Sequence, residues 1–270
     1  MVKKFMALTM MLLFMPVVTS CSSLLSDTAT PTAARDTASA LVSTESVRTI
    51  RFSGYDWMVK SSPGRVGPGP NYFSGSSNNV WVDLQGRLHM RITFSNGRWY
   101  CAEVGTRRSL GYGAYRFYLD SPVDNLDPNA VLGLFTWSDD PAYNNREIDI
   151  EFSRWGDATN TNNAQYVVQP WDLPQHLLRF PVPSGMSATT HSFTWSSNRV
   201  YFRSLKGHYR TPPSNSYILR QWTFTGSGVP KAGGENARIK LWLMNGDAPT
   251  EGKTLEVIIK KFEFVPMIVP

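Results

Sequence analysis

Three acidic side chains alternate along one short stretch of the sequence. Glu147, Asp149 and Glu151 occupy every second position within NREIDIEFSRWGD, residues 145–157, with an isoleucine in each gap. Successive side chains of a β-strand point to opposite faces, so a strand here places the three carboxyl groups together and turns the isoleucines toward a core. The pattern is typical of two arrangements: an edge strand that shows a charged face to water, or a catalytic carboxylate cluster.

The spacing of the outer pair suits one class of reaction. Four residues of strand rise span about 13 Å, and two glutamate side chains that lean toward each other bring their carboxyl groups to about 5 to 6 Å. A retaining glycosidase needs its two carboxyl groups about 5 to 5.5 Å apart, whereas an inverting one needs about 6.5 to 9.5 Å. Asp149 would share a proton or hydrogen bond with one glutamate and raise the pKa of the other. Spacing alone leaves the solvated acidic face as an equal alternative.

The elements around the acids are predicted to be β-strands. Within residues 47–270, short runs of alternating apolar and polar residues are broken by Gly, Pro, Asn and Asp, and no long window has a helical period. The segments 80–94 and 191–204 predict hairpins with turns near Gly86 and Asn198. We therefore predict an all-β, antiparallel domain, most simply a β-sandwich or jelly roll.

The segment RIKLWLMNGDAP, residues 238–249, sorts its side chains onto two faces of a strand. Isoleucine and leucine share one face, and Lys240, Trp242 and Met244 share the other. Trp242 therefore belongs either to the outer core of a second layer or to the wall of a groove.

The first 46 residues predict export and anchoring instead of a folded element. Residues 1–20 combine two lysines with an apolar run and form a signal peptide, and its ending, VVTSC, resembles the lipobox of bacterial lipoproteins, in which Cys21 is lipidated. An ordinary secretory signal is the alternative. Residues 21–46 are rich in Ser, Thr and Ala, which is typical of a flexible tether. We expect an extracytoplasmic protein, anchored by lipid to a bacterial membrane or cell surface.

Composition and charge argue against several other functions. The formal charge of +6 falls to +4 without the two lysines of the signal peptide, and the basic residues are scattered, so nucleic acid is not an expected partner. Lipidation of Cys21 leaves Cys101 without a disulfide partner. The four His lack the spacing of metal ligands, no nucleophile elbow is present, and Asp139 and Asp140 fit a solvated loop better than a structural calcium site. We predict no cofactor and no metal, and we expect a monomer.

The segment EIDIE is similar to the Glu-x-Asp-x-Glu signature of glycoside hydrolase family 16, which includes laminarinases, lichenases, agarases and carrageenases. It has no bulge residue before the second Glu, so it resembles the lichenase and xyloglucan-transglycosylase form. Weaker similarities follow in the family's order over residues 48–265, from FSGYDWMVK through GYGAYRFYLD to HSFTWSSNRVYF and RIKLWLMNGD. The segment VLGLFTW stands where the family usually has Trp-Pro-Ala.

The resemblance implies a β-jelly roll whose concave face forms a substrate cleft. Carried over to this sequence, it implies Glu147 as the nucleophile, Glu151 as the general acid and then base, and Asp149 as an assisting acid. It also implies that the partner of the cleft is a polysaccharide.

A sugar cleft needs aromatic and polar side chains beside the acids. Sugar rings stack on aromatic faces, and their hydroxyl groups need amide, guanidinium or carboxylate partners. For each aromatic candidate a core position is the alternative, and Arg154 could instead neutralise Glu151. The predicted substrate-binding residues are Trp137, Arg154, Trp155, Tyr166, Gln169, Trp171 and Trp242.

These inferences converge on a retaining endo-glycoside hydrolase that acts on a β-linked polysaccharide, first of all a β-1,3- or β-1,3-1,4-glucan. A transglycosylase, or a hydrolase of sulfated galactans such as agar or carrageenan, would share the same acids. A non-catalytic carbohydrate-binding surface protein would share only the fold.

Overall fold

The computed structural model describes residues 47–267 of the chain. The predicted signal peptide, the tether and the lipidation site Cys21 lie outside the described residues. Within the described part, no helix is both long enough and apolar enough to cross a membrane.

β-Strands make up most of the described chain, and the helices are short 3-10 segments. The strands are β1 (Thr49–Phe52), β2 (Tyr55–Val59), β3 (Tyr72–Phe73), β4 (Val80–Val82), β5 (Leu88–Ser95), β6 (Arg98–Thr106), β7 (Gly113–Leu119), β8 (Ala130–Trp137), β9 (Ile148–Phe152), β10 (Ala164–Val168), β11 (Leu177–Phe180), β12 (Thr189–Ser196), β13 (Arg199–Lys206), β14 (Ile218–Thr225), β15 (Asn236–Leu243) and β16 (Leu255–Pro266). The 3-10 helices are η1 (Pro141–Arg146), η2 (Asn215–Tyr217) and η3 (Met244–Gly246).

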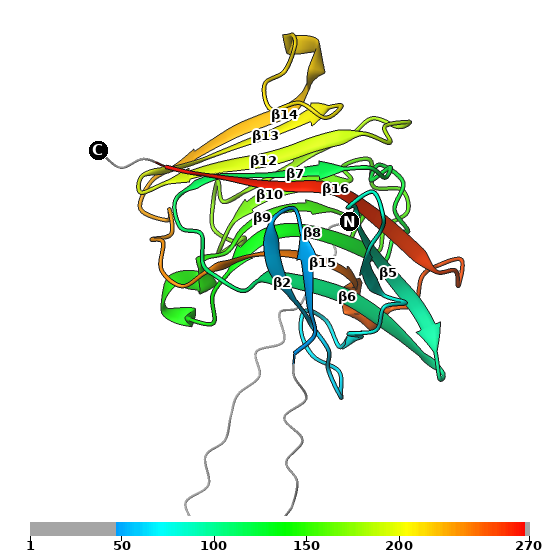
Figure 1. Ribbon diagram of the computed structural model, residues 1–270. Helices are drawn as coiled ribbons and strands as arrows, with labels where there is room; N and C mark the ends of the chain where they lie inside the picture. Colours follow the sequence, from blue (N-terminus) through cyan, green and yellow to red (C-terminus); the bar gives the residue numbers. More distant parts are fainter. Residues whose placement is uncertain (1–46, 268–270) are drawn as a thin grey trace, which may run out of the picture. The chain divides into compact units, whose positions relative to one another are not determined.

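The strands follow one another in a single curved sheet that folds into two layers (Figure 1). Its order is β11-β10-β9-β8-β15-β6-β5-β16-β7-β12-β13-β14. We call β11 to β6 the cleft layer and β5 to β14 the outer layer. The pairings along this path are antiparallel, and β2 and β4 add to it antiparallel at β6 and β5. The protein is thus an all-β, antiparallel sandwich of the jelly-roll type, as predicted.

The period-two alternation builds the core between the two layers. Ile150 and Phe152 of β9 are fully buried, and the Phe152 ring lies 4.6 Å from the His191 ring of β12 in the outer layer. In the same way, Tyr166 of β10 stacks on Phe202 of β13 with 4.8 Å between ring centroids. Burying a large apolar side chain contributes about 1.5 to 3 kcal/mol, so these contacts hold β9 firmly in place.

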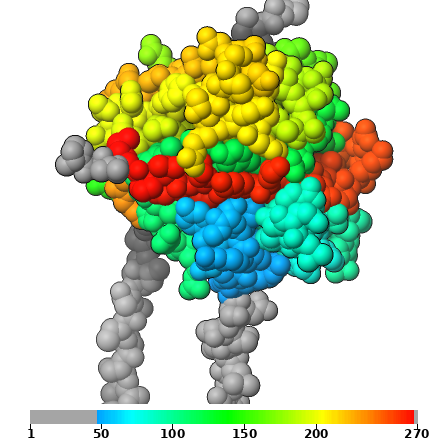
Figure 2. Space-filling view, turned by 45° about the horizontal axis from the view of Figure 1, so that its top comes forward, coloured from blue at the N-terminus to red at the C-terminus, as the bar shows by residue number. Residues whose placement is uncertain are grey.

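Strand β16 joins parts of the chain that are far apart in sequence. It pairs with β5 over one part of its length and with β7 over the other. Figure 2 shows it in red, between the yellow strands of the outer layer and the blue β1–β2 hairpin. The backbone N–H of Phe262 donates to Ser53 Oγ in that hairpin at 2.9 Å, which ties the hairpin to the outer layer.

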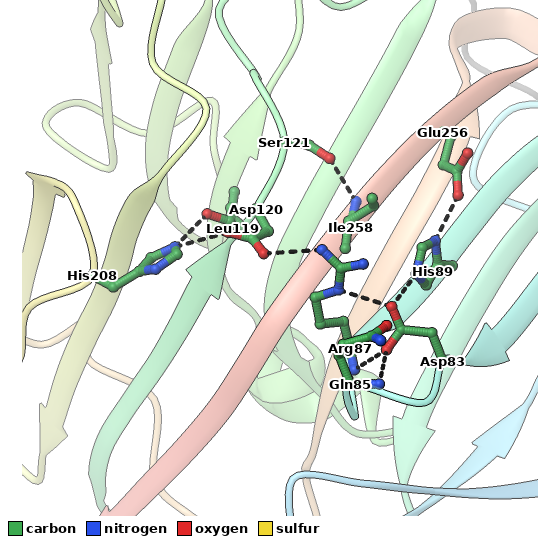
Figure 3. Close-up of polar contacts among 10 residues, drawn as sticks. All are labelled: Asp83, Gln85, Arg87, His89, Leu119, Asp120, Ser121, His208, Glu256 and Ile258. Carbon is green, nitrogen blue, oxygen red and sulfur yellow. Dashed lines mark hydrogen bonds and ion pairs between the residues drawn. The ribbon is translucent and has the colours of Figure 1, made fainter.

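A polar network reinforces this joint on β5 (Figure 3). The two ring nitrogens of His89 lie 2.6 Å from Glu256 of β16 and 2.9 Å from Asp83 of the β4–β5 turn. Arg87 donates to Asp83 and also to Asp120, which follows β7. Because these side chains connect β4, β5, β7 and β16, we assign them to the stability of the outer layer.

Candidate active site

Glu147, which directly precedes β9, and Asp149 and Glu151 of β9 line a cavity of about 770 Å³ in the cleft layer. The cavity walls come mainly from β8, β9, β10, β11 and β15, with residues 67–68 at one side. The residues between the acids are fully buried in the core, as the alternation predicts. The acids therefore face the concave side of the molecule, and that side is open to a ligand.

The turn before β9 fixes the position of Glu147. Arg146 is buried, and its guanidinium donates to the Lys231 carbonyl and to Asp140. Glu147 itself is extended, with φ −87° and ψ 122°, and its carbonyl accepts from the backbone N–H of Gln169 at 3.2 Å. The alternation thus begins one residue before the first residue of β9, which places all three acids on one face.

Cross-strand register places a polar row beside Glu151. From β6 to β11 the row reads Glu103, Lys240, Gly133, Glu151, Gln165 and Arg179. Lys240 and Glu151 are separated by two strand spacings, or about 10 Å. Gly133 between them has no side chain, so the floor of the cleft is bare backbone at this point.

The three carboxyl groups hold protons more tightly than isolated acids do. Burial, followed by the charge of Glu151, raises the pKa of Glu147 to about 7. Burial and the charges of both glutamates raise the pKa of Asp149 well above its usual value, and burial also raises the pKa of Glu151. A hydrogen bond between Asp149 and Glu147 favours a protonated Asp149 beside an ionised Glu147. The cluster therefore holds protonated and ionised carboxyl groups together near neutral pH.

Side-chain hydrogen bonds orient two of the acids. Arg179 Nε donates to Gln165 Oε1 at 3.1 Å, and Gln165 Nε2 donates to Glu151 Oε2 at 2.7 Å. The second bond favours the ionised form of Glu151 and partly offsets the effect of burial on its pKa. Gln169, which directly follows β10, donates from Nε2 to Asp149 Oδ2 at 3.3 Å. Both glutamines thus fix carboxyl groups from the side of β10.

Three cations gather on the opposite wall around one carboxylate. Glu103 is 2% exposed and pairs with Lys60 at 2.8 Å, Arg238 at 3.1 Å and Lys240 at 3.3 Å. Burial would raise the pKa of Glu103, but the charges of Lys240 and Lys60 lower it overall. The charges of Lys240 and Arg238 also favour the ionised form of Glu147.

Five of the predicted substrate-binding side chains line the cavity: Trp137, Trp155, Gln169, Trp171 and Trp242. Trp171 is 61% exposed, so the face of its ring is accessible at the rim. Trp242 lies on the cavity side of β15, which makes it part of a groove wall and not of a second core.

Tyr166 does not reach the cavity, and its predicted role in substrate binding is wrong. The side chain is fully buried between the layers, where its hydroxyl donates to Ser204 Oγ at 2.7 Å. Strand phase explains the error, because Tyr166 and Gln169 are three positions apart and an extended chain turns such residues to opposite faces. Gln165 takes the cavity side instead.

Arg154 does not line the cavity either. It comes after the end of β9, where the strand alternation stops, and its guanidinium donates to Asn125 Oδ1 at 3.1 Å and to the Ala158 carbonyl at 3.3 Å. The prediction that Arg154 binds a sugar hydroxyl or neutralises Glu151 is therefore wrong.

Several polar side chains that line the cavity were not predicted to do so: Lys60, Gln165, Arg179, Arg238 and Lys240. Glu103, which pairs with three of them behind the cavity wall, was not predicted either. The alternation that selects Trp242 also selects Arg238 and Lys240, and the alternation that selects Gln169 also selects Gln165. Glu103 and Arg179 carry no such signal, because they enter the site only through the pairing of β6 and β11 into the cleft layer.

The two aspartates considered for calcium have partners within the protein. Asp139 Oδ1 accepts from the indole N–H of Trp137 at 2.9 Å, and Asp140 Oδ1 accepts from the backbone N–H of Ala142 at 3.1 Å. Among residues 47–267, no group of three His, Cys, Asp or Glu side chains is arranged to hold a metal ion.

No family model and no curated protein match the chain. Its fold is similar to that of a Bacillus licheniformis β-glucanase, with 19% identity over 78% of this chain and 92% of that chain and a TM-score of 0.57. A prokaryotic β-1,3-1,4-glucanase (lichenase) from a mouse hindgut metagenome is also 19% identical, over 78% and 93% of the two chains, with a TM-score of 0.56. An immunostimulatory antigen and pseudo β-1,3-glucanase of Mycobacterium tuberculosis is 18% identical, over 78% and 91%, with a TM-score of 0.56.

These likenesses define the protein by its fold, which is the jelly roll of the β-glucanases. With identities of at most 19% among these three structures, they show the fold alone. Whether the chain has a glycosidase activity must therefore be argued from its own acids and its own cavity.

Proposed function

We propose that the protein is a retaining endo-glycoside hydrolase, of the kind found in glycoside hydrolase family 16, that acts on a β-linked polysaccharide. The observation that carries the proposal is the row of Glu147, Asp149 and Glu151 on the floor of an open cleft with aromatic walls. A solvated acidic face would leave its carboxyl groups in water, whereas Asp149 is only 3% exposed. Buried, mutually perturbing carboxyl groups in a cleft are characteristic of an acid–base site.

The arrangement supports a double displacement. Glu147 attacks the anomeric carbon while Glu151 donates its proton to the leaving oxygen, so that the glycosidic C–O bond breaks and a glycosyl ester of Glu147 forms. Water then attacks the same carbon, gives its proton to Glu151 and releases Glu147 as a carboxylate. Protonated Asp149 stabilises the ionised Glu147 before attack and after release.

The first substrate class that we propose is a β-1,3- or β-1,3-1,4-glucan, because the proteins of similar fold include glucanases with these descriptions. A sulfated galactan is the alternative, which the cations on the cavity wall favour.

The decisive experiment measures reducing ends released from mixed-linked and β-1,3-glucans, xyloglucan, agar and carrageenan by the wild-type protein and by Glu147→Gln. We expect release from at least one polymer by the wild type alone, and proton NMR of the first product should show the β-anomer. Equal release by the two proteins from every polymer would overturn the proposal.

A second function shares the fold without the chemistry. One protein of similar fold is described as a pseudo β-1,3-glucanase, so a non-catalytic carbohydrate-binding protein is the specific alternative. In that case wild type and Glu147→Gln would both bind a polysaccharide and release nothing. A transglycosylase would give elongated products when acceptor sugars are added, which product analysis separates from hydrolysis.

For the part of the chain outside the described residues, we propose export and lipidation at Cys21, which would anchor the protein to a bacterial membrane or cell surface. The support is the sequence VVTSC after an apolar run. The mass of the mature N-terminal peptide tests this proposal, because an unmodified peptide or a different cleavage site would contradict it.

A further inference from the structure

The cation cluster of the cleft carries more positive charge than its own carboxylate balances. Lys60, Arg238 and Lys240 pair with Glu103 alone among the buried acids, which leaves a formal charge of +2 on the four side chains. Among residues 47–267, the only other acid in an ion pair with the cluster is Asp139, 4.0 Å from Arg238 and with 93% of its side chain exposed. The charges of Lys240 and Arg238 also act on Glu147, and that of Lys240 acts on Glu151, but neither glutamate forms an ion pair with the cluster.

Aromatic rings hold these cations in place without neutralising them. Lys60 Nζ lies 4.1 Å from the centre of the Phe73 ring, and Lys240 Nζ lies 4.8 Å from that of Phe135. The guanidinium of Arg238 lies 5.8 Å from the Trp137 ring. Cation–π contacts stabilise a cation by about 0.5 to 2 kcal/mol and keep its full charge, so the cluster stays positive.

Burial and repulsion within the cluster both disfavour the charged form of Lys240. Burial lowers the pKa of Lys240, and the neighbouring charges of Lys60 and Arg238 lower it further, although Glu103 opposes both effects. An anion placed among these groups would remove the repulsion. Among residues 47–267, none of Glu147, Asp149 and Glu151 forms an ion pair with the cluster, so these acids do not take the place of that anion.

The cluster faces the same cavity as the acids. Lys240 and Arg238 line it from β15, and Lys60 lines it from the end of β2. The bare backbone at Gly133 separates Lys240 from Glu151, so a sugar lying on this floor would have its reacting bond at one side and the cations at the other.

From this juxtaposition we infer that Lys60, Arg238 and Lys240 form a subsite for an anionic substituent, a sulfate ester or a carboxylate, on the polysaccharide. The inference rests on the proposed function and sharpens it, since it favours an acidic β-linked polysaccharide over a neutral glucan as the best substrate. The planar fork of Arg238 suits either group, and the lysines add point charges.

The test measures binding by calorimetry, with Glu147→Gln as the background so that no polymer is cleaved. The ligands are a sulfated galactan, the same galactan after chemical desulfation, a β-linked polyuronate and a neutral mixed-linked glucan. We expect the sulfated polymer or the polyuronate to bind at least about tenfold more tightly than the neutral polymers, which is the range of a charge-assisted contact. Which of the two binds identifies the substituent.

Substitution shows whether the cleft cluster is responsible. On the same background, Lys240→Met should weaken binding of the preferred polymer about tenfold and leave neutral-glucan binding within about twofold, while Lys240→Arg should retain the preference. Lys253→Met is the matched control, because this exposed lysine pairs with Glu251 away from the cavity and tests general attraction between a basic protein and a polyanion. Circular dichroism and thermal unfolding verify that each variant is folded.

The inference is overturned if the desulfated and sulfated galactans bind equally and the polyuronate is no better, or if Lys240→Met and Lys253→Met behave alike. Failure of the proposed function looks different. If no polymer in the panel is cleaved by the wild type but binding of an acidic polymer depends on Lys240, the subsite stands and the hydrolase proposal falls. If neutral glucans are cleaved and Lys240→Met does not change that cleavage, the hydrolase proposal stands and the subsite falls.

Discussion

The acids of β9 are held close together at a cost to the folded state. Each of the three has its pKa raised, mainly by burial, so the folded protein resists their ionisation. Hydrogen bonds from Gln165 and Gln169 offset only part of this effect. A group that destabilises the fold at neutral pH and faces a cleft is more easily explained by chemistry than by architecture.

The first prediction concerns Glu147→Gln, which should abolish hydrolysis and also stabilise the protein at pH 8. Glu147 binds its proton more tightly in the folded state, with a pKa of about 7 against an ordinary 4.5. The stability from its protonated form is therefore complete below pH 4.5 and is lost as the pH rises through 7. Glutamine stays neutral, so we expect a gain of about 1 to 3 kcal/mol at pH 8.

Denaturant unfolding at pH 8 and at pH 4 measures this difference. The gain should nearly vanish at pH 4, where wild-type Glu147 is itself protonated. The exposed Glu251→Gln provides the control, which should change stability little at either pH. A gain of the same size at both pH values would show that packing, and not charge, is responsible.

The second prediction concerns Gln165→Leu, which should shift the pH dependence of hydrolysis. The hydrogen bond from Gln165 favours ionised Glu151, so its loss raises the pKa of Glu151. If Glu151 is the general acid, the alkaline limb of kcat/KM should move upward by up to about one pH unit. The control is Gln221→Leu on the outer layer, where the side chain accepts from Tyr201. An alkaline limb that does not move would contradict the role given to Glu151.

At the scale of elements, local patterns predicted more than long-range pairing did. The hairpin turn near Asn198 is confirmed between β12 and β13, and the turn near Gly86 is confirmed between β4 and β5. Both follow from alternation and from turn residues that lie next to each other in the sequence. The face of Glu147, Asp149 and Glu151 was predictable for the same reason.

The register between distant strands was not predictable. Lys240 and Glu151 share a row only because β15 pairs with β8 and β8 with β9, and no local pattern specifies those partners. For the same reason Glu103 could not be placed in the site from the sequence, because its strand β6 joins the cleft layer by pairing with β15, which is far away in the sequence. Tyr166 is a different case, because its own alternation with Gln165 was sufficient to assign it to the core.

The third prediction concerns the bare floor formed by β8. A Cβ at Gly133 would meet the Phe135 ring at 3.5 Å, which is an ordinary contact, so Gly133→Val should fold with its free energy of unfolding changed by no more than about 1 kcal/mol. The valine would nevertheless stand between Lys240 and Glu151. We expect kcat/KM to fall at least about tenfold, because a substrate displaced by even about 1 Å reacts much more slowly.

Thr223→Val, at an exposed position of β14 in the outer layer, controls for the introduction of a β-branched apolar side chain. Steady-state kinetics and thermal unfolding on the two variants distinguish the outcomes. Unchanged kinetics in a folded Gly133→Val protein would mean that substrate does not lie on this part of the floor.

At the scale of the whole molecule, the three acids of the site and several acids of the outer layer respond to pH in opposite directions. The acids in the cleft layer at β9 have raised pKa values, whereas acids of the outer layer such as Asp83, Glu256 and Glu263 have lowered ones. The raised pKa values make the folded protein less stable as the pH rises toward neutrality. The lowered pKa values make it less stable as the pH falls below the ordinary carboxyl range. Stability should therefore be greatest at mildly acidic pH, between the two effects.

The fourth prediction isolates the outer-layer half of this balance with Glu263→Gln. Burial would raise the pKa of Glu263, but the hydrogen bond from Arg210 and the charge of Arg116 hold it at about 2. Its contribution is therefore present above the ordinary value of 4.5 and is lost as the pH falls through 2. We expect the variant to be less stable by about 1 to 3 kcal/mol at pH 7, since two strands and a loop lose a shared anion.

Denaturant unfolding at pH 7, 4 and 3 measures the difference in free energy of unfolding between wild type and Glu263→Gln. This difference should shrink at each lower pH, because protonation of Glu263 in the unfolded state removes the stabilisation that its ionised form gives to the fold. Asp56→Asn removes the carboxylate of an exposed pair with Arg51 and should change stability by less than about 1 kcal/mol throughout. A difference that stays constant from pH 7 to pH 3 would mean that Glu263 stabilises the outer layer through packing, and the proposed contrast in pH response between the acids of the site and those of the outer layer would then lose its main support.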